Sequence, residues 1–401
     1  MVFKPILWYN YIVCIGIHIL RLVIIWAFLL IILKLTKLKL TNCRNYSNLN
    51  IKFSNNMNIF IGNNAQGKTN LLESIVFLSL TKSHRVGQNP NVVMFNKNVC
   101  KINGVIKKAD IITKLECRIG DKKELFKNGT IIRKVSDYIS NLNVIVFGPD
   151  DLDIVKGSPN NRRNLLNIEL SQIDKDYLNT YNEFNKILRI RNEYLKMMYS
   201  NSLTDKSYLD ILTDKFIEKS IYIYQKRNEF INKINESVND NYNLISKGDN
   251  IRVIYENNIH FDNYEVDEIR KEMESIIRDN YYKEIKYGMS LYGPHRDDFS
   301  FYINDSDIKY YGSQGQQKLA ILSFKLSEID IFEDITLEKP ILLLDDIFSE
   351  FDIKKRNNLI KYINSKDIQS FITTTDLKNI NKRYLDGASI YEVKDGNIER
   401  K

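Results

Sequence analysis

A glycine-rich run of eight residues constrains this chain more than any other feature. Residues 62–69 read GNNAQGKT and match the pattern G-x-x-x-x-G-K-[ST] at every fixed position. The apolar residues 57–61 before the run predict a strand, and the leucine-rich residues after it predict a helix. A strand that feeds such a loop into a helix is typical of a phosphate-binding loop in an α/β domain.

Each fixed position of this loop has a physical role. Gly62 and Gly67 let the backbone wrap closely, so that N–H groups and a helix N-terminus face phosphate oxygens. Lys68 brings an ammonium group to the β- and γ-phosphates, and Thr69 offers a hydroxyl ligand to Mg²⁺. ATP and Mg²⁺ are therefore the expected cofactors. The predicted nucleotide-binding residues of the loop are Gly62, Asn63, Asn64, Ala65, Gln66, Gly67, Lys68, Thr69 and Asn70.

A second nucleotide element lies near the other end of the chain. Residues 341–344 read ILLL, which predicts a buried strand, and Asp345 and Asp346 follow it directly. We expect Asp345 to hold Mg²⁺ through water and Asp346 to act as the general base on the attacking water. Many strands end in an acidic residue, so this element indicates a nucleotide site only in combination with the phosphate-binding loop.

The residues SQGQQ at 313–317 open an apolar helix shortly before the acidic strand. They resemble the signature of ABC ATPases, in which Ser313 and Gly315 would meet the γ-phosphate held by an opposite subunit. A polar loop that caps a helix through Ser313 has the same local pattern. The order of the elements along the chain favours the signature. That interpretation requires a head-to-head homodimer induced by ATP, with Lys68, Ser313 and Asp346 as catalytic residues.

Two further segments complete the ABC pattern. Residues 349–352 (SEFD) follow the acidic strand at the place of the D-loop, which crosses the dimer interface. Many ABC proteins place a γ-phosphate-sensing histidine at the end of the next strand. This chain has Thr373, Thr374 and Thr375 there, and the pattern does not say which of them takes that position.

The apolar periodicity divides the chain into an interrupted α/β domain. Residues 36–160 and 288–401 read as two halves of an ATPase head, and residues 161–287 read as a charged helical lobe inserted between them. The predicted fold class is α/β, an ABC-type P-loop ATPase head with a mixed sheet, split by this lobe. An ordinary helical subdomain is favoured over a long coiled coil, because no strict heptad runs for several repeats.

Residues 1–35 form an apolar N-terminal extension with the length of a membrane span. A charge at Arg21, near its middle, is costly in a bilayer. The extension is read as a start-site artefact, a genuine anchor or a buried helix, and the first of these is favoured, so a membrane partner is not expected. The four cysteines lack C-x-x-C spacing, which indicates neither a zinc ribbon nor a disulfide framework, and a cytoplasmic location is the default.

Motifs distributed over residues 36–400 resemble the RecF family of bacterial DNA replication and repair proteins. The motifs that carry the resemblance are NCRNY at 42–46, GNNAQGKTNLL at 62–72, KSHR at 82–85, FGPDDL at 147–152, KGSP at 156–159, RIRN at 189–192 and GPHRDD at 293–298. This chain departs from the family pattern at Cys43, where phenylalanine is usual, at Phe351, where the D-loop has leucine, and in the N-terminal extension.

The resemblance implies a slow, Mg-dependent and DNA-stimulated ATPase. It would dimerise on ATP, bind duplex and gapped or single-stranded DNA near strand junctions, and help to load RecA with RecO and RecR. A net charge of +8 permits a polyanionic partner. The candidate phosphate contacts are Lys82, His84, Arg85, Arg162 and Arg163. Arg296, which lies beside Asp297 and Asp298, is expected to form a structural or interface ion pair instead of a DNA contact.

Two other functions remain open from the sequence. One is a membrane-associated ABC component that uses the N-terminal extension as its anchor and requires a partner permease. The other is an ATP-dependent scaffold for repair proteins with little turnover. Nucleotide-linked DNA binding separates both of them from the DNA-binding ATPase.

Overall fold

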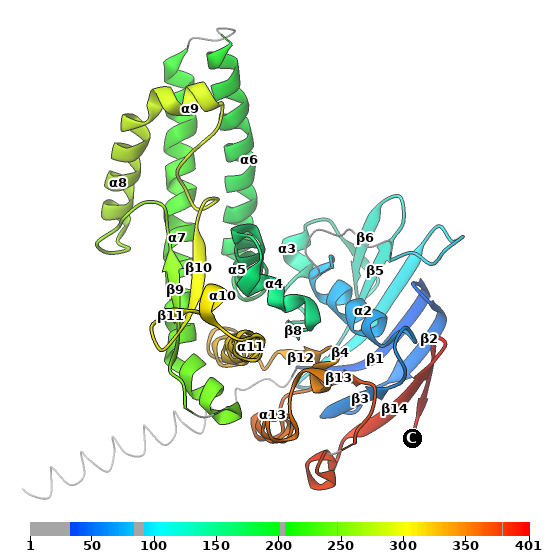
Figure 1. Ribbon diagram of the computed structural model, residues 1–401. Coiled ribbons are helices and arrows are strands. Elements are labelled where there is room, and N and C mark those ends of the chain that lie inside the picture. Colours follow the sequence, from blue (N-terminus) through cyan, green and yellow to red (C-terminus); the bar gives the residue numbers. More distant parts are fainter. Residues whose placement is uncertain (1–32, 84–91, 201–204, 247, 379) are drawn as a thin grey trace, which may run out of the picture.

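The computed structural model describes residues 33–83, 92–200, 205–246, 248–378 and 380–401 (Figure 1). Most of the N-terminal extension lies outside these residues, as do the candidate DNA contacts His84 and Arg85. The described chain forms an α/β head from which a helical arm projects, as Figure 1 shows. The predicted fold class is confirmed.

The first strand corrects the boundary of the N-terminal extension. Strand β1 spans Leu33–Cys43, and Leu33 and Leu35 are buried in the sheet. Leu33 pairs with Lys108 and Leu35 with Ile106. Residues 33–35 therefore belong to the head, because their alternating apolar side chains fill its core.

Two six-stranded sheets form the head. The first is antiparallel, in the order β2 (Tyr46–Lys52), β1, β4 (Cys100–Lys108), β5 (Ile111–Ile119), β6 (Lys123–Lys127) and β7 (Thr130–Ile132). The second is mixed, in the order β15 (Asn397–Arg400), β14 (Ser389–Lys394), β3 (Met57–Ile61), β13 (Ser370–Thr374), β12 (Ile341–Leu344) and β8 (Val144–Phe147). Strands β6 and β7 form a tight hairpin, in which Lys127 pairs with Thr130.

The mixed sheet organises the core of the head. Its strands β14, β3, β13, β12 and β8 run parallel, so their carboxyl ends meet at one edge. One face packs with helix α2 (Lys68–Leu80) and the antiparallel sheet, through Phe60, Leu71 and Phe371 among others. The opposite face packs on helix α11 (Gln314–Thr336). The loops at the carboxyl edge are where ligands bind in sheets of this kind.

Short helices connect these layers and close the second half of the head. They are α3 (Val135–Tyr138), the 3₁₀ turn η1 (Pro149–Asp151), α4 (Leu152–Lys156), α10 (Ile308–Tyr311), α12 (Ile347–Glu350), α13 (Ile353–Lys366) and the 3₁₀ turn η2 (Lys382–Leu385).

The arm is a hairpin of two long helices, α6 (Lys175–Tyr199) and α7 (Lys206–Ile245), with α5 (Pro159–Ile173) at its base. Helices α8 (Val266–Asp279) and α9 (Tyr281–Tyr287) lie against it (Figure 1). The apolar side of α7 packs on α11 of the head as well as on α6, so the arm is anchored in the main core.

The insertion is not purely helical, which corrects the boundaries drawn from periodicity. Strand β9 (Ile251–Glu256) lies inside residues 161–287 and pairs with β10 (Asp298–Ile303) beyond them. With β11 (Ser306–Asp307) these strands form a three-stranded sheet beside α7. Backbone hydrogen bonds between β9 and β10 thus join the arm to the second half of the head. The apolar periodicity of the helices did not reveal this pairing.

The cysteines also differ from the expectation. A disulfide joins Cys43 and Cys100, with their Cα atoms 5.0 Å apart, and Cys117 is free and buried. The two partners are 57 residues apart in sequence and meet because β1 and β4 are neighbouring strands. Local spacing therefore carried no signal of this bond. Among the residues that the structure describes, no helix has the length and apolar character to cross a membrane.

Candidate nucleotide site

The glycine-rich loop, residues 62–69, joins β3 to α2 and is called the cradle from here on. Gly67 has φ of 111° at the N-terminus of α2, a conformation that favours glycine. A Cβ atom at Gly62 would lie 2.4 Å from the carbonyl oxygen of Val393. Both glycines are therefore required by the backbone itself, the first by close packing on β14 and the second by its left-handed turn.

Lys68 is buried at the base of the cradle. Its Nζ donates to the carbonyl oxygens of Gly62 and Asn63, at 2.6 and 2.8 Å. Burial lowers the pKa of Lys68, and the carboxylates of Asp346 and Asp345 oppose that shift. An ammonium group held by loop carbonyls is ready to turn to phosphate oxygens, because anionic acceptors form the stronger hydrogen bonds.

The turn at residues 42–46 supports the cradle from outside. The Asn45 amide donates to the carbonyl of Gln66 at 3.1 Å, and the Tyr46 hydroxyl donates to the carbonyl of Gly67 at 3.0 Å. The Gln66 side chain accepts from the backbone of Asp395 at 2.6 Å. Gln66, predicted to contact nucleotide, thus uses its side chain to brace the cradle against the loop after β14.

The carboxyl ends of β12 and β13 bring the acidic pair to the cradle. Oδ1 of Asp345 accepts from the hydroxyl of Thr69 at 3.0 Å and from the hydroxyl of Thr373 at 2.6 Å. These two strands are adjacent and parallel, so their ends lie together. The two residues predicted to hold Mg²⁺, Thr69 and Asp345, are therefore in direct contact.

Asp346 occupies a left-handed turn, with φ of 47°, immediately after β12. Its backbone N–H donates to the Thr373 hydroxyl at 2.9 Å, and Ser349 donates to its Oδ2 at 2.9 Å. Oδ1 of Asp346 is buried and has no hydrogen-bond partner among the described residues. An acceptor held in this way beside the cradle can take a proton from a water molecule.

Thr373 is the member of the threonine run that touches both acidic residues. Thr374 instead donates to the carbonyl of Asp376 at 2.9 Å. The geometry therefore selects Thr373 as the residue best placed to respond to a ligand between the cradle and the acidic pair.

A cavity of about 320 Å³ collects these groups. It is lined by Asn64, Ala65, Gly67, Lys68, Thr69, Asn70, Pro149, Asp150, Asp345 and Asp346. Most of the predicted nucleotide and metal residues are thus brought to one place. Pro149 and Asp150 were missed as site residues; the signal was an acidic turn after β8, which lies beside and parallel to β12.

The signature segment, residues 313–317, lies elsewhere in the same chain. Ser313 caps α11, since its Oγ accepts from the N–H of Gln316 at 3.2 Å and the Gln316 side chain accepts from the N–H of Ser313 at 3.0 Å. Ser313, Gln314 and Gly315 are exposed, and none of them lines the 320 Å³ cavity. In Figure 1, α10, which directly precedes this segment, lies apart from α2. One chain alone does not bring Ser313 to Lys68.

The candidate DNA contacts that the structure describes differ in how exposed and how fully paired they are. Arg162 is a correction: it is 3% exposed, pairs with both oxygens of Asp298 at 2.5 and 2.8 Å, and donates to three carbonyls near α4. Such a guanidinium has no free face for a phosphate group. Arg163 is half-buried and donates to the carbonyl of Asp297 at 2.7 Å. Lys82 is exposed.

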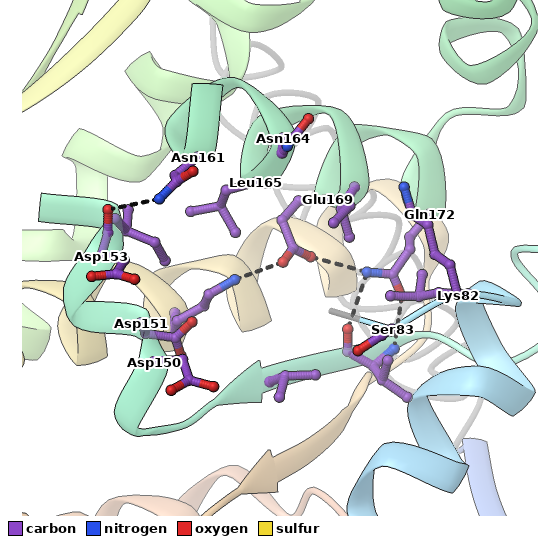
Figure 2. Close-up of a pocket in the computed structure, with 16 residues that line it drawn as sticks. Lys82, Ser83, Asp150, Asp151, Asp153, Asn161, Asn164, Leu165, Glu169 and Gln172 are labelled. Atoms are coloured by element: carbon purple, nitrogen blue, oxygen red, sulfur yellow. Dashed lines mark hydrogen bonds and ion pairs between the residues drawn. The ribbon is translucent and has the colours of Figure 1, made fainter. Parts of the chain in front are cut away.

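Lys82 lies at a second cavity, of about 540 Å³, between the head and α5 (Figure 2). A polar chain crosses it: Lys325 donates to Glu169 at 2.6 Å, and Gln172 donates to the other oxygen of Glu169 at 3.0 Å. The lining also includes three aspartates, at 150, 151 and 153. Acids outnumber bases in this lining, which disfavours a phosphate ligand inside the cavity.

The GPHRDD segment, residues 293–298, forms a buried junction between arm and head. Arg227 of α7 donates to Asp297 at 3.1 Å and to the carbonyl of Pro294 at 2.6 Å. Asp298 pairs with Arg162 of α5. Arg296, expected to form a structural or interface ion pair, donates to the Met289 sulfur and the carbonyl of Ser290. The aspartates pair with arginines distant in sequence, because the helices of the arm bring those guanidinium groups to them.

The described part of the chain holds no group of three or more His, Cys, Asp or Glu side chains arranged for a metal ion. The fold and the site together define an ABC-type ATPase head with a helical arm. A sequence profile described as the RecF/RecN/SMC N terminal domain matches residues 34–398. Solved SMC heads share the fold: the head from Pyrococcus furiosus has a TM-score of 0.53 at 14% identity, covering 92% of this chain and 96% of that one.

Relatives with higher sequence identity show which family of this class the chain belongs to. A protein of Ligilactobacillus salivarius named DNA replication and repair protein RecF is 40% identical over 367 residues, covering 91% of this chain and 97% of its own. Its namesake in Listeria welshimeri is 39% identical over 373 residues, with 91% and 99% covered. A solved structure of the recombination mediator protein RecF with ATP in the RecFOR pathway has a TM-score of 0.83 at 31% identity, with 92% and 98% covered. The chain belongs to the RecF family, which confirms the resemblance seen in the sequence.

Proposed function

We propose that this chain is an ATP-dependent DNA-binding protein of replication and recombinational repair, and a slow Mg-dependent ATPase. The observation that carries the proposal is the 320 Å³ cavity, which joins Lys68, Thr69 and the acidic pair while Ser313 lies exposed outside it. The site has a cradle and a base but lacks its signature residue. Two chains in head-to-head contact supply both parts to each nucleotide.

The residues fit Mg-ATP. The cradle amides and Lys68 bind the phosphates, and the hydroxyl of Thr69 with the carboxylate of Asp345 would hold Mg²⁺, which prefers such oxygen ligands. The metal ion supplies neutralisation of phosphate charge when it is bound. Asp346 orients the attacking water and takes its proton through the buried, unpartnered Oδ1.

The DNA partner is supported by the family and by charge. The relatives carry the names DNA replication and repair protein and recombination mediator protein, and this chain has a net charge of +8. We propose that the ATP-bound dimer holds DNA near junctions of single and double strands in the cytoplasm. There it acts with RecO and RecR to promote loading of RecA.

Nucleotide-linked DNA binding tests this function. The affinity for a gapped duplex is measured across salt concentrations with and without Mg-ATP, for the wild type and for Lys68→Ala. We expect ATP to strengthen the salt-sensitive binding of the wild type only, because the variant lacks the ammonium that neutralises the phosphates. Lys361→Ala, which removes an exposed lysine of α13, is the matched control and should behave as the wild type. DNA affinity that is independent of ATP would contradict the proposal and favour a scaffold or a membrane-associated component.

A further inference from the structure

Two adjacent tyrosines beside the signature segment face solvent. Tyr310 and Tyr311 end α10 and are 72% and 79% exposed, far above what tyrosine rings usually show. Tyr311 is two residues from Ser313, so their Cα atoms lie within about 8 Å. Exposed aromatic pairs of this kind are enriched at the centre of protein interfaces, where they supply contact area at low entropic cost.

The backbone under these rings is fixed. Asp307 caps α10 through the N–H of Lys309 at 2.8 Å, and Ile308 is buried. The buried Gln317 side chain donates to the carbonyl of Ile308 at 2.7 Å, which ties α10 to the first turn of α11. The rings are therefore presented on a rigid base that moves with the signature segment, as an interface anchor requires.

The cradle of a second copy is the surface that the proposed dimer would bring to the signature segment. Its exposed tip, Asn63, Asn64 and Ala65, is uncharged, and no aromatic residue occurs among the described residues that line the 320 Å³ cavity. An uncharged amide tip and an uncharged aromatic pair meet without like-charge repulsion. Lys309, whose Nζ lies 5.4 Å from the Tyr310 ring centre, adds a positive charge beside the tyrosine pair.

We propose that Tyr310 and Tyr311 pack over the nucleotide cradle of a second copy of this chain and anchor the closed dimer beside Ser313. The inference rests on the proposed head-to-head arrangement and assigns its aromatic contact. Each composite site then takes its cradle and acidic pair from one chain, and its signature serine and tyrosine pair from the other.

Sedimentation velocity with Mg-ATP tests the contact with a double variant, Tyr310→Ser with Tyr311→Ser. We expect its ATP-dependent dimerisation to weaken at least about tenfold, since truncated aromatic anchors typically cost that much or more. The matched control replaces Tyr282 and Tyr287 by serine on α9 of the arm, where they are 84% and 59% exposed. This control should dimerise as the wild type. Replacement of Tyr310 and Tyr311 by phenylalanine should retain dimerisation, because the rings remain.

Mixing two defective chains distinguishes a contact across the dimer from one within a chain. The double serine variant keeps an intact cradle, and Lys68→Ala keeps intact tyrosines. Their heterodimer contains one complete composite site, so at a protein concentration where the double serine variant stays largely monomeric the mixture should show more ATP turnover than either variant alone. Absence of that gain, or normal dimerisation of the double serine variant beside a dimerising wild type, would overturn the tyrosine assignment alone. A wild type that stays monomeric with ATP would overturn the dimer proposal together with it.

Discussion

The cradle and the arm junction are built from similar residues, but the cradle is arranged to bind a ligand and the junction to hold the arm on the head. Both are glycine-containing segments that gather lysine or arginine with aspartate. At the cradle, Lys68 is held by loop carbonyls and Asp346 keeps a buried oxygen without a described partner. At the junction, Arg227 and Asp297 are each 1% exposed and pair with one another.

The partners of the charged side chains, and not their residue types, distinguish the binding site from the structural junction. The charges of the cradle are incompletely paired within the chain, so a ligand can complete them and gain free energy. Asp297 at the junction also keeps one buried oxygen without a described partner, but its other oxygen pairs with Arg227, and Asp298 pairs with Arg162. These ion pairs join α5 and α7 to the start of β10, so their role is to fix the arm on the head. Substitutions in the two regions should therefore fail in different ways.

Breaking the junction should cause the largest change, and that change should be in stability. Arg227→Ala leaves the buried Asp297 carboxyl, whose pKa burial already raises to about 7, without its guanidinium partner, and a broken buried pair costs about 3–5 kcal/mol. Chemical denaturation measures this loss, and Arg296→Ala, an exposed neighbour in the GPHRDD segment, serves as the control with a change under about 0.5 kcal/mol. Equal effects of the two variants would remove the distinction between paired and exposed arginines here.

Altering the cradle should instead reduce turnover at nearly constant stability. Asp346→Asn removes the base, and we expect ATP hydrolysis to fall at least about a hundredfold while ATP-bound dimers persist. Steady-state hydrolysis and sedimentation measure the two effects. Asp386→Asn, an exposed aspartate far along the chain, is the matched control. Rapid turnover by the Asp346 variant would mean that another group activates the water.

The contrast also explains what the sequence could predict. The cradle is a contiguous motif flanked by its own strand and helix, so residues 62–69 identify their chemistry locally. The acidic pair was also identified, because an apolar run followed by two aspartates has a clear position in a parallel sheet. The fold class followed from these two elements and the helical texture between them.

The junction could not be predicted in this way. Arg162 pairs with Asp298, and Arg227 with Asp297, across long stretches of chain, so no local pattern marks either arginine as buried. From sequence alone, an arginine in a helix fits a DNA contact as well as it fits a buried ion pair that supports the fold. The disulfide between Cys43 and Cys100 was missed for the same reason, since only the pairing of β1 with β4 brings the sulfur atoms together.

The junction should also show a moderate pH dependence. His295 packs against Phe184 and Phe216, and burial lowers its pKa to about 4, with Arg296, Arg163 and Arg191 adding to the effect. Since the folded pKa lies below the unfolded value of about 6.5, stability is full above pH 6.5 and is lost as the pH falls toward 4. His295 alone should account for a loss of about 1–2 kcal/mol between pH 6.5 and 5. The Asp297 carboxyl offsets part of it, because burial raises its pKa to about 7 and it takes up a proton in the folded state over the same range. His295→Asn should flatten that part of the curve, measured by denaturation at each pH, whereas an unchanged slope would show that other groups cause it.

The smallest expected effect concerns Lys82, the exposed member of the predicted DNA contacts that the structure describes. A single lysine beside one phosphate contributes about one unit to the salt slope of binding, so Lys82→Ala should lower that slope by about one and weaken all sequences alike. DNA affinity measured at several salt concentrations with Mg-ATP detects this change, with Lys361→Ala as the control for loss of a positive charge. Arg162 is unsuitable for the same test, because its replacement would leave the Asp298 carboxylate without its ion-pair partner and disturb the junction. If the salt slope is unchanged by Lys82→Ala, the DNA-binding surface lies away from the acidic second cavity. The salt dependence of binding would then come from exposed basic residues elsewhere on the head.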